Sequence, residues 1–203
     1  MIELKNVTKA YGNKTIFSKL SFRIDTGEFV VFSGKSGCGK STMLSLIGGI
    51  EKATSGQIIV DGTDITNNYN RIKYFSEKVA FLFQNFALSE NKTVKQNLEM
   101  VPKKSRSGVS IPDALKAVGI EDKLNEYIYT LSGGEQQRVA LARIMIKKCD
   151  IILADEPTGS LDKENANAVI DILKKLNTEN GKTVIMVTHD EGLKKVGDRI
   201  INM

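Results

Sequence analysis

Nine consecutive residues near the start of the chain, GKSGCGKST at positions 34–42, allow only a few folds. They follow an apolar run at 29–32 that is typical of a buried strand, and they precede a helix-like apolar segment at 43–47. Glycines let the backbone turn tightly and direct successive N–H groups at one point. A helix that begins near Lys40 adds free N–H groups and the positive end of its dipole. The segment therefore predicts a cradle for phosphate groups between a strand and a helix.

The residue types in this loop suit different parts of a nucleotide. We expect the Lys40 ammonium to reach the outer phosphates, the Ser41 hydroxyl to ligate Mg²⁺, and Thr42 to support an inner phosphate. The remaining members line the cradle: Gly34, Lys35, Ser36, Gly37, Cys38 and Gly39. A glycine-rich turn that only caps a helix is the alternative, but the flanking strand and helix favour a nucleotide.

Length and composition limit the class of protein. A chain of 203 residues, 41% hydrophobic and 26% charged, can bury a sizeable core, and we expect one domain over 1–203. No apolar run approaches the ~20 residues of a membrane-spanning helix, and the N-terminal residues lack a signal-peptide core, so we expect a cytoplasmic protein. Cys38 and Cys149 suggest neither a disulfide framework nor a metal cluster. The net charge is +5, but the lysines and arginines are scattered among acidic residues along the chain. The densest basic segment, 103–106, is typical of a solvated loop.

Two alternating segments, 2–7 and 17–24, predict antiparallel strands ahead of the phosphate loop. Tyr11 falls in the turn between them. An exposed aromatic ring at this point could stack on a purine base, although a tyrosine in a turn is more often structural.

The middle of the chain changes from strands to helices. Further strands are expected at 57–60 and 79–83, and the pattern is helical from 91 to 129. Thr93 is expected to cap a helix, whereas Pro102 and Pro112 are expected to interrupt helices. This region predicts a helical insertion.

The run LSGGE at 131–135 opens a long, largely apolar helix. Ser132 and Glu135 have the spacing of a capping box. That spacing does not explain Gly133 and Gly134, since each glycine costs about 1 kcal/mol in a helix. Bare backbone at a helix N-terminus suits a second anion, and the cradle already holds one set of phosphates. We therefore expect these residues to face another nucleotide.

Two acidic residues end the apolar run 151–154, at the edge where open α/β sheets bind ligands. Asp155 is expected to hold Mg²⁺, directly or through water, and Glu156 to act as general base on the attacking water. Pro157 disfavours the helical region for the residue before it, so we expect Glu156 to be extended. An acidic turn after a strand is the alternative.

Three other polar residues stand at the ends of predicted elements. Gln84 ends the strand 79–83 and could ligate the metal or hold the attacking water, with a surface glutamine as the alternative. His189, the only histidine, follows the strand 182–188 beside the expected γ-phosphate. Asp162 is expected to cap an amphipathic helix.

In their order along the chain, these motifs resemble those of ABC-type ATPases. LSGGE, the run ADEPTGSLD at 154–162 and the pair Thr188-His189 are specific to that family, and the resemblance covers essentially the whole chain. It implies an α/β P-loop NTPase fold with a RecA-like core, an antiparallel β subdomain and a helical subdomain at about 85–148.

The resemblance also implies cofactors and residue roles. ATP and Mg²⁺ are expected, bound by a head-to-tail homodimer that closes on ATP and loosens after hydrolysis. The resemblance implies that Tyr11 stacks on adenine, that Gln84 links the Mg²⁺ site to a membrane partner, and that Glu156 is the catalytic base. Contact with the γ-phosphate of the opposite subunit is implied for Ser132, Gly133 and Gly134. Asp162 is implied to couple the two sites, and His189 to sense the γ-phosphate.

Within the family, IGGI at 47–50 and the ADEPTGSLD run resemble the exporter and mechanotransmitter group that includes macrolide and lipoprotein-release ATPases. FQNFAL at 83–88 followed by ENKTV at 90–94 is similar to its bacteriocin-export branch. This implies an ATPase on the inner face of the cell membrane that drives an integral membrane permease exporting a peptide, bacteriocin, lipid or drug.

Two other functions compete with transport. One is an ABC ATPase that acts on nucleic acid, on ribosomes or in membrane signalling, but the chain has one phosphate loop and no sustained heptads, so no nucleic-acid partner is expected. The other is a P-loop kinase for a small molecule, which would have no use for the LSGGE segment.

Overall fold

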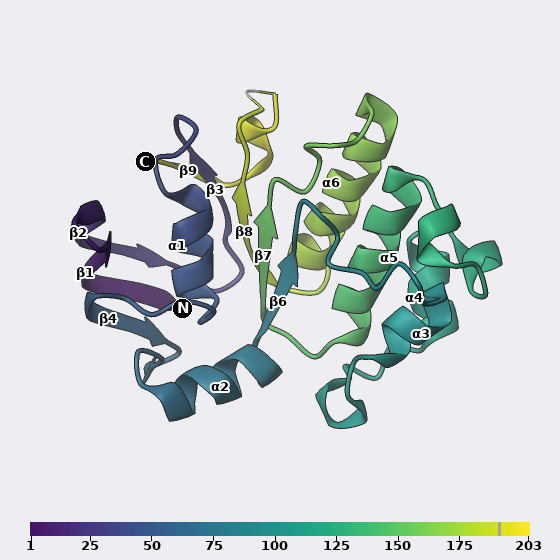
Figure 1. Cartoon of the computed structure of the whole chain (residues 1–203), viewed down its shortest axis with the longest axis horizontal. Coiled ribbons are helices and arrows are strands. Elements are labelled where there is room, and N and C mark those ends of the chain that lie inside the picture. Colours follow the sequence, from purple (N-terminus) through teal and green to yellow (C-terminus); the bar gives the residue numbers. More distant parts are fainter. Residues whose placement is uncertain (191) are drawn as a thin grey trace.

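The computed structural model describes residues 1–190 and 192–203. In this part of the chain, the strands form two sheets (Figure 1). The antiparallel sheet has the order β2-β1-β4-β5 and consists of β2 (Lys14–Ile24), β1 (Ile2–Tyr11), β4 (Ser55–Val60) and β5 (Thr63–Asp64). The parallel sheet has the order β6-β7-β8-β3-β9 and consists of β6 (Val79–Leu82), β7 (Ile151–Asp155), β8 (Thr183–Val187), β3 (Phe29–Ser33) and β9 (Arg199–Asn202). The predicted antiparallel pairing of the first two strands is confirmed.

Helices cover both faces of the parallel sheet. The α-helices of the described residues are α1 (Lys40–Ile47), α2 (Asn68–Glu77), α3 (Val94–Glu99), α4 (Ile111–Ala117), α5 (Gly133–Ile146) and α6 (Lys163–Thr178), of which α3 and α4 pack against α5. Figure 1 shows α1 between the two sheets and α5 and α6 on the far side of the parallel sheet. No helix in the described residues is both long and apolar enough to cross a bilayer.

The alternation of side chains along the central strands creates two hydrophobic cores. In β3, Val30 and Phe32 pack into the core that contains α1 and the antiparallel sheet. Phe29 and Val31 point the other way, into the core that contains α5 and α6. The parallel strands are therefore buried on both faces, as their continuous apolar sequences require.

The helix α3 begins at its predicted cap, but one proline of the same region has a different role from the predicted one. Thr93 forms a capping box with Gln96 at the start of α3. Pro112 does not interrupt a helix. It lies in the first turn of α4, behind the Ser110 cap, where a missing N–H breaks no helical hydrogen bond. Pro102 precedes a short 3₁₀ turn at 103–105.

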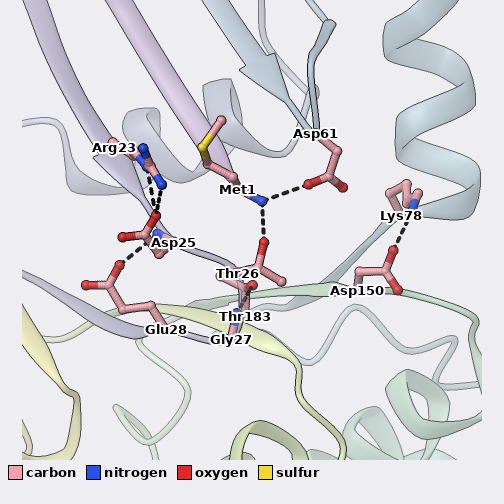
Figure 2. Close-up of polar contacts among 10 residues, drawn as sticks. All are labelled: Met1, Arg23, Asp25, Thr26, Gly27, Glu28, Asp61, Lys78, Asp150 and Thr183. Atoms are coloured by element: carbon pink, nitrogen blue, oxygen red, sulfur yellow. Dashed lines mark hydrogen bonds and ion pairs between the residues drawn. The ribbon is translucent and has the colours of Figure 1, made fainter.

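Polar contacts at the amino end of the parallel strands join the two sheets (Figure 2). The Met1 amino group donates to the Thr26 hydroxyl at 2.6 Å and pairs with Asp61 at 2.7 Å. The Gly27 N–H donates to the Thr183 hydroxyl at 2.9 Å, where β8 begins. These contacts lie at the edge opposite the carboxyl ends of the strands, where the candidate site residues lie.

Candidate active site

The loop between β3 and α1 forms the predicted cradle. Gly39 is the N-cap of α1, with φ at +101° and no side-chain cap. A side chain here would be strained by this φ, and its Cβ would fall 2.5 Å from Ile16. Because no side chain of residues 1–190 or 192–203 caps the helix, its first N–H groups are open to an anion.

Lys40 is the buried cation of this loop, with only 6% of its surface exposed. Its ammonium donates to the Gly34 carbonyl at 2.9 Å and to the Lys35 carbonyl at 3.0 Å. No ion pair with an acidic side chain is present for Lys40 among the described residues. The charge is therefore held inside the loop by neutral acceptors, where a phosphate would compensate it.

Ser41 and Asp155 provide oxygen donors beside the cradle. The Ser41 hydroxyl donates to the Asp155 carboxylate at 3.0 Å, although the two residues are far apart in sequence. Burial raises the pKa of Asp155, and the Ser41 hydrogen bond and the charge of Lys40 only partly oppose that rise. A cation at this point would stabilise the buried carboxylate.

This donor set fits Mg²⁺. Hard oxygen ligands suit the ion, which typically binds one or two carboxylates together with substrate phosphates and water. No cluster of three or more His, Cys, Asp or Glu side chains able to hold a metal occurs in the described part of the chain. The residues therefore match an ion that substrate phosphates help to hold.

Glu156 and His189 follow the paired strands β7 and β8 and meet at the same edge. The Glu156 N–H donates to the Val187 carbonyl at 3.0 Å, and its carboxylate lies 2.8 Å from Nδ1 of His189. The expected extended backbone at Glu156 is wrong, because its φ is +45°. The N–H stays bonded to the neighbouring strand while the chain must turn sharply before Pro157, and this turn places the residue in the left-handed region.

Gln84 lies two residues beyond the end of β6, close to the Glu156 carboxylate. A Cβ on Gly159 would be 3.2 Å from Nε2 of Gln84 and 3.4 Å from Oε2 of Glu156. The absence of a side chain at Gly159 therefore leaves room for the amide beside the carboxylate.

Tyr11 does not lie in the predicted turn but is the last residue of β1, paired with Lys14 of β2, and it is 46% exposed. Its hydroxyl donates to the Glu51 carboxylate and also interacts with the Thr42 hydroxyl at the start of α1. Burial and the Glu51 hydrogen bond raise the pKa of Tyr11, so the phenol stays protonated. The ring thus lies next to the first turn of the helix that follows the cradle.

The start of α5 has the predicted capping box. The Ser132 hydroxyl accepts from the Glu135 N–H at 3.3 Å, and the Glu135 carboxylate accepts from the Ser132 N–H at 2.8 Å. The two glycines differ: a Cβ on Gly133 meets nothing closer than 3.8 Å, whereas a Cβ on Gly134 would fall 2.5 Å from the Asn165 side chain. Packing within the chain therefore requires a glycine at 134, but not at 133.

Sequence reasoning missed Asn165, which joins α5 to the turn before α6. The Asp162 carboxylate caps α6 by accepting the Asn165 N–H at 2.9 Å, as predicted for a cap, and it also accepts the Asn165 amide at 2.6 Å. Arg138 donates to the Asn165 Oδ1 at 2.6 Å. A polar residue three positions after an N-cap is a detectable signal, but nothing in the sequence pairs it with Arg138.

The structure does not bring the LSGGE residues to the cradle of the same chain. The helix α5 packs on one face of the parallel sheet and α1 on the other. Among the described residues, no hydrogen bond or ion pair joins 132–134 to 34–42. A nucleotide in this chain's cradle therefore leaves Ser132, Gly133 and Gly134 unused.

Comparisons with known proteins agree with this geometry. Residues 17–159 match the family model described as ABC transporter. The chain is 41% identical over 210 residues to the probable ABC transporter ATP-binding protein PEB1C of Campylobacter jejuni subsp. jejuni serotype O:23/36 (strain 81-176), with 100% of this chain and 86% of that protein covered. It is also 41% identical over 216 residues to the uncharacterized ABC transporter ATP-binding protein MJ0796 of Methanocaldococcus jannaschii, with 99% of this chain and 92% of that protein covered.

Two solved structures are also similar. One is a dimeric structure of MJ0796, described as a bacterial ABC transporter cassette, with a TM-score of 0.90 and 39% identity over 100% of this chain and 94% of that one. The other is a dimeric post-hydrolysis state of the MJ0796 ATP-binding cassette bound to ADP and Pi, with a TM-score of 0.87 and 38% identity over the same shares of the two chains.

Proposed function

The chain belongs to the ABC transporter family, and on that premise we propose that it powers export through a separate integral membrane permease. It is an ATP-binding subunit with the predicted α/β P-loop ABC ATPase fold, and it is an ATPase. We take residues 1–203 as a single ATPase domain with its helical subdomain at about 85–148. The observation that carries the proposal is the meeting of Lys40, Asp155 and Glu156 at the carboxyl edge of one parallel sheet.

Hydrolysis assigns a separate task to each group at this edge. Glu156 takes a proton from the attacking water, whose oxygen bonds to the γ-phosphorus as the bond to ADP breaks. His189 donates a hydrogen bond from its Nδ1–H to the Glu156 carboxylate and thereby orients it while it stays ionised. Gln84 holds the water. The Lys40 ammonium neutralises the outer phosphates. Mg²⁺, held by Ser41 and Asp155 with Gln84 nearby, would supply further charge neutralisation at those phosphates.

The second set of phosphate contacts comes from another copy of the chain. The LSGGE residues have open backbone at the N-terminus of α5 but do not reach the cradle of their own chain. A head-to-tail homodimer would place Ser132, Gly133 and Gly134 of one copy on the γ-phosphate held by the other. Asp162 would then couple the two sites across the interface, and loss of the γ-phosphate would loosen the dimer.

An apolar hollow supports docking of a permease. The hollow has a volume of about 340 Å³, and its lining includes Phe75, Phe81, Phe83 and Met100. Phe81 and Phe83 stack with centroids 5.1 Å apart. Phe83 directly precedes Gln84, so an apolar helix of the permease in this hollow would act on the residue beside the catalytic carboxylate.

The direction of transport rests on the segments 47–50, 83–88 and 90–94, which resemble exporters. We propose a peptide, bacteriocin, lipid or drug as cargo, and a location on the inner face of the cell membrane through the permease. A role in membrane signalling, or on nucleic acid or ribosomes, is the alternative, and the apolar hollow favours a membrane partner over nucleic acid.

Copurification tests the partner. The tagged protein is expected to retain an integral membrane chain in mild detergent, and Phe75→Glu is expected to release it. Tyr69→Glu is the matched control, because Tyr69 lies on the same helix, is 78% exposed and does not line the hollow. Recovery of nucleic acid or ribosomes in place of a membrane chain would contradict the transport proposal.

Two variants test the ATPase cycle. Glu156→Gln is expected to bind ATP, stop turnover and accumulate as a dimer on a sizing column, because it keeps the cradle and removes the base. Ser132→Arg is expected to keep ATP binding but lose both dimer and turnover. Rapid hydrolysis by Glu156→Gln would refute the base, and full turnover by Ser132→Arg would refute the shared site.

A further inference from the structure

Lys9, Glu51 and Tyr11 form a cluster beside the cradle that the proposed hydrolysis does not use. The Lys9 ammonium lies 4.4 Å from the centroid of the Tyr11 ring, on one of its faces. It pairs with the Glu51 carboxylate at 2.8 Å and donates to the Lys52 carbonyl at 3.0 Å. The Glu51 carboxylate in turn accepts the Tyr11 hydroxyl. These contacts fix both the tilt and the direction of the ring.

The burial of the three residues is uneven. Only 8% of Lys9 is exposed, whereas Tyr11 is 46% exposed. Burial alone would raise the pKa of Glu51, but hydrogen bonds from Lys9 and Tyr11 outweigh it, so the net pKa is lowered and the carboxylate is ionised. The ring therefore has a buried cation against one face and an exposed surface open to a ligand.

We propose that Lys9 and Glu51 are positioning residues that hold the Tyr11 ring as the platform for the purine base of the bound nucleotide. This inference rests on the proposed function, since it takes the nucleotide in the cradle as given. The cation withdraws electron density from the ring, and a ring with a depleted face stacks more strongly on an electron-rich purine.

The cluster also connects the platform to the phosphate loop. Glu51 follows α1, and its N–H donates to the Ser45 carbonyl of that helix at 3.1 Å. The Tyr11 hydroxyl additionally interacts with Thr42 in the first turn of α1. The base platform and the cradle therefore belong to one connected unit, which fixes the distance between the base and the phosphates.

A base-free ligand separates this role from general damage to the site. Lys9→Met is expected to raise the KM for ATP about threefold to tenfold with little change in kcat, because one cation–π contact is lost. Inhibition by inorganic tripolyphosphate, which fills the cradle without a base, is expected to be unchanged. Lys9→Arg, which keeps a cation over the ring, is expected to restore the KM.

The control and a second variant keep the test decisive if Lys9→Met folds poorly. Lys5→Met makes the same change on the same strand, where the lysine is half-exposed and pairs with Glu3, and it is expected to behave as the parent protein. Glu51→Gln keeps an acceptor for the Tyr11 hydroxyl but removes the carboxylate charge that pairs with Lys9. It is expected to raise the KM for ATP without affecting inhibition by tripolyphosphate.

Two outcomes would overturn the proposal. One is an unchanged KM for ATP in both Lys9→Met and Glu51→Gln. The other is an equal loss of affinity for ATP and tripolyphosphate. The proposed function has its own test in this series: if Lys40→Ala still hydrolyses ATP normally, the cradle assignment fails, whereas failure of the Lys9 and Glu51 variants alone leaves it intact.

Discussion

Alanine substitutions at the two adjacent glycines of α5 separate packing within the chain from contact with a second nucleotide. At Gly133 an added Cβ meets nothing closer than 3.8 Å. Gly133→Ala should therefore stabilise the nucleotide-free protein by about 0.5–1 kcal/mol, because alanine has less backbone freedom to lose in a helix. At Gly134 the same Cβ would fall 2.5 Å from Asn165, well inside van der Waals contact.

Asn165 cannot simply move away from that Cβ. Its two amide atoms are held at 2.6 Å by Asp162 and by Arg138. Breaking one such hydrogen bond to a charged group costs about 1.5–3 kcal/mol, and the helix-propensity gain returns about 1 kcal/mol. Gly134→Ala should therefore lose about 1–2 kcal/mol, so that the two variants differ by about 2–3 kcal/mol.

Urea unfolding of the nucleotide-free protein measures this difference, and thermal midpoints should differ by about 5–10 °C. In the Glu156→Gln background, both alanines are expected to weaken the ATP-dependent dimer, because each adds a methyl group where a partner's phosphate would approach. Equal stability of the two variants would refute the packing argument at Gly134. A normal ATP-dependent dimer in that background, together with normal turnover of the Gly133→Ala single variant, would refute the argument that the bare backbone of Gly133 serves a second nucleotide.

Three further substitutions test the site and the core. Burial raises the pKa of Asp155 above its ordinary value of 3.8, so its ionised form opposes folding at neutral pH. Asp155→Asn should therefore stabilise the nucleotide-free protein at pH 7, lose that advantage as pH falls toward 3.8, and lack Mg²⁺-dependent turnover. Hydrogen bonds from the backbone and hydroxyl of Ser132 lower the pKa of Glu135, so its charge stabilises α5 above pH 4.5. Glu135→Gln should therefore cost about 0.5 kcal/mol of unfolding free energy at pH 7. In urea titrations this difference should shrink as pH falls below 4.5, and a difference that stays constant with pH would contradict the argument. Leu153→Ala in β7, at a fully buried position, should cost about 2–5 kcal/mol of unfolding free energy, and a loss below 1 kcal/mol would contradict its place in the core.

Several features of the site could be predicted because they depend on neighbours in the sequence. The cradle needs glycines before a helix start, and both capping boxes need a fixed spacing of three residues, so short stretches around Lys40, Thr93 and Ser132 contain the whole signal. The acidic residues at 155–156 were placed correctly for the same reason, since an apolar run of strand length ends where they begin.

Other features needed the tertiary structure because they depend on residues far apart in the chain. The order β6-β7-β8-β3 brings Ser41, Asp155 and His189 to one edge, and no local pattern specifies which strand lies beside which. The left-handed backbone of Glu156 arises from a hydrogen bond to the neighbouring strand, and the need for glycine at 134 arises from Asn165. Residues adjacent in the sequence specify the chemical groups, the phosphate loop and the helix caps. Only packing, which selects among long-range pairings by the apolar surface that they bury, decided which groups meet.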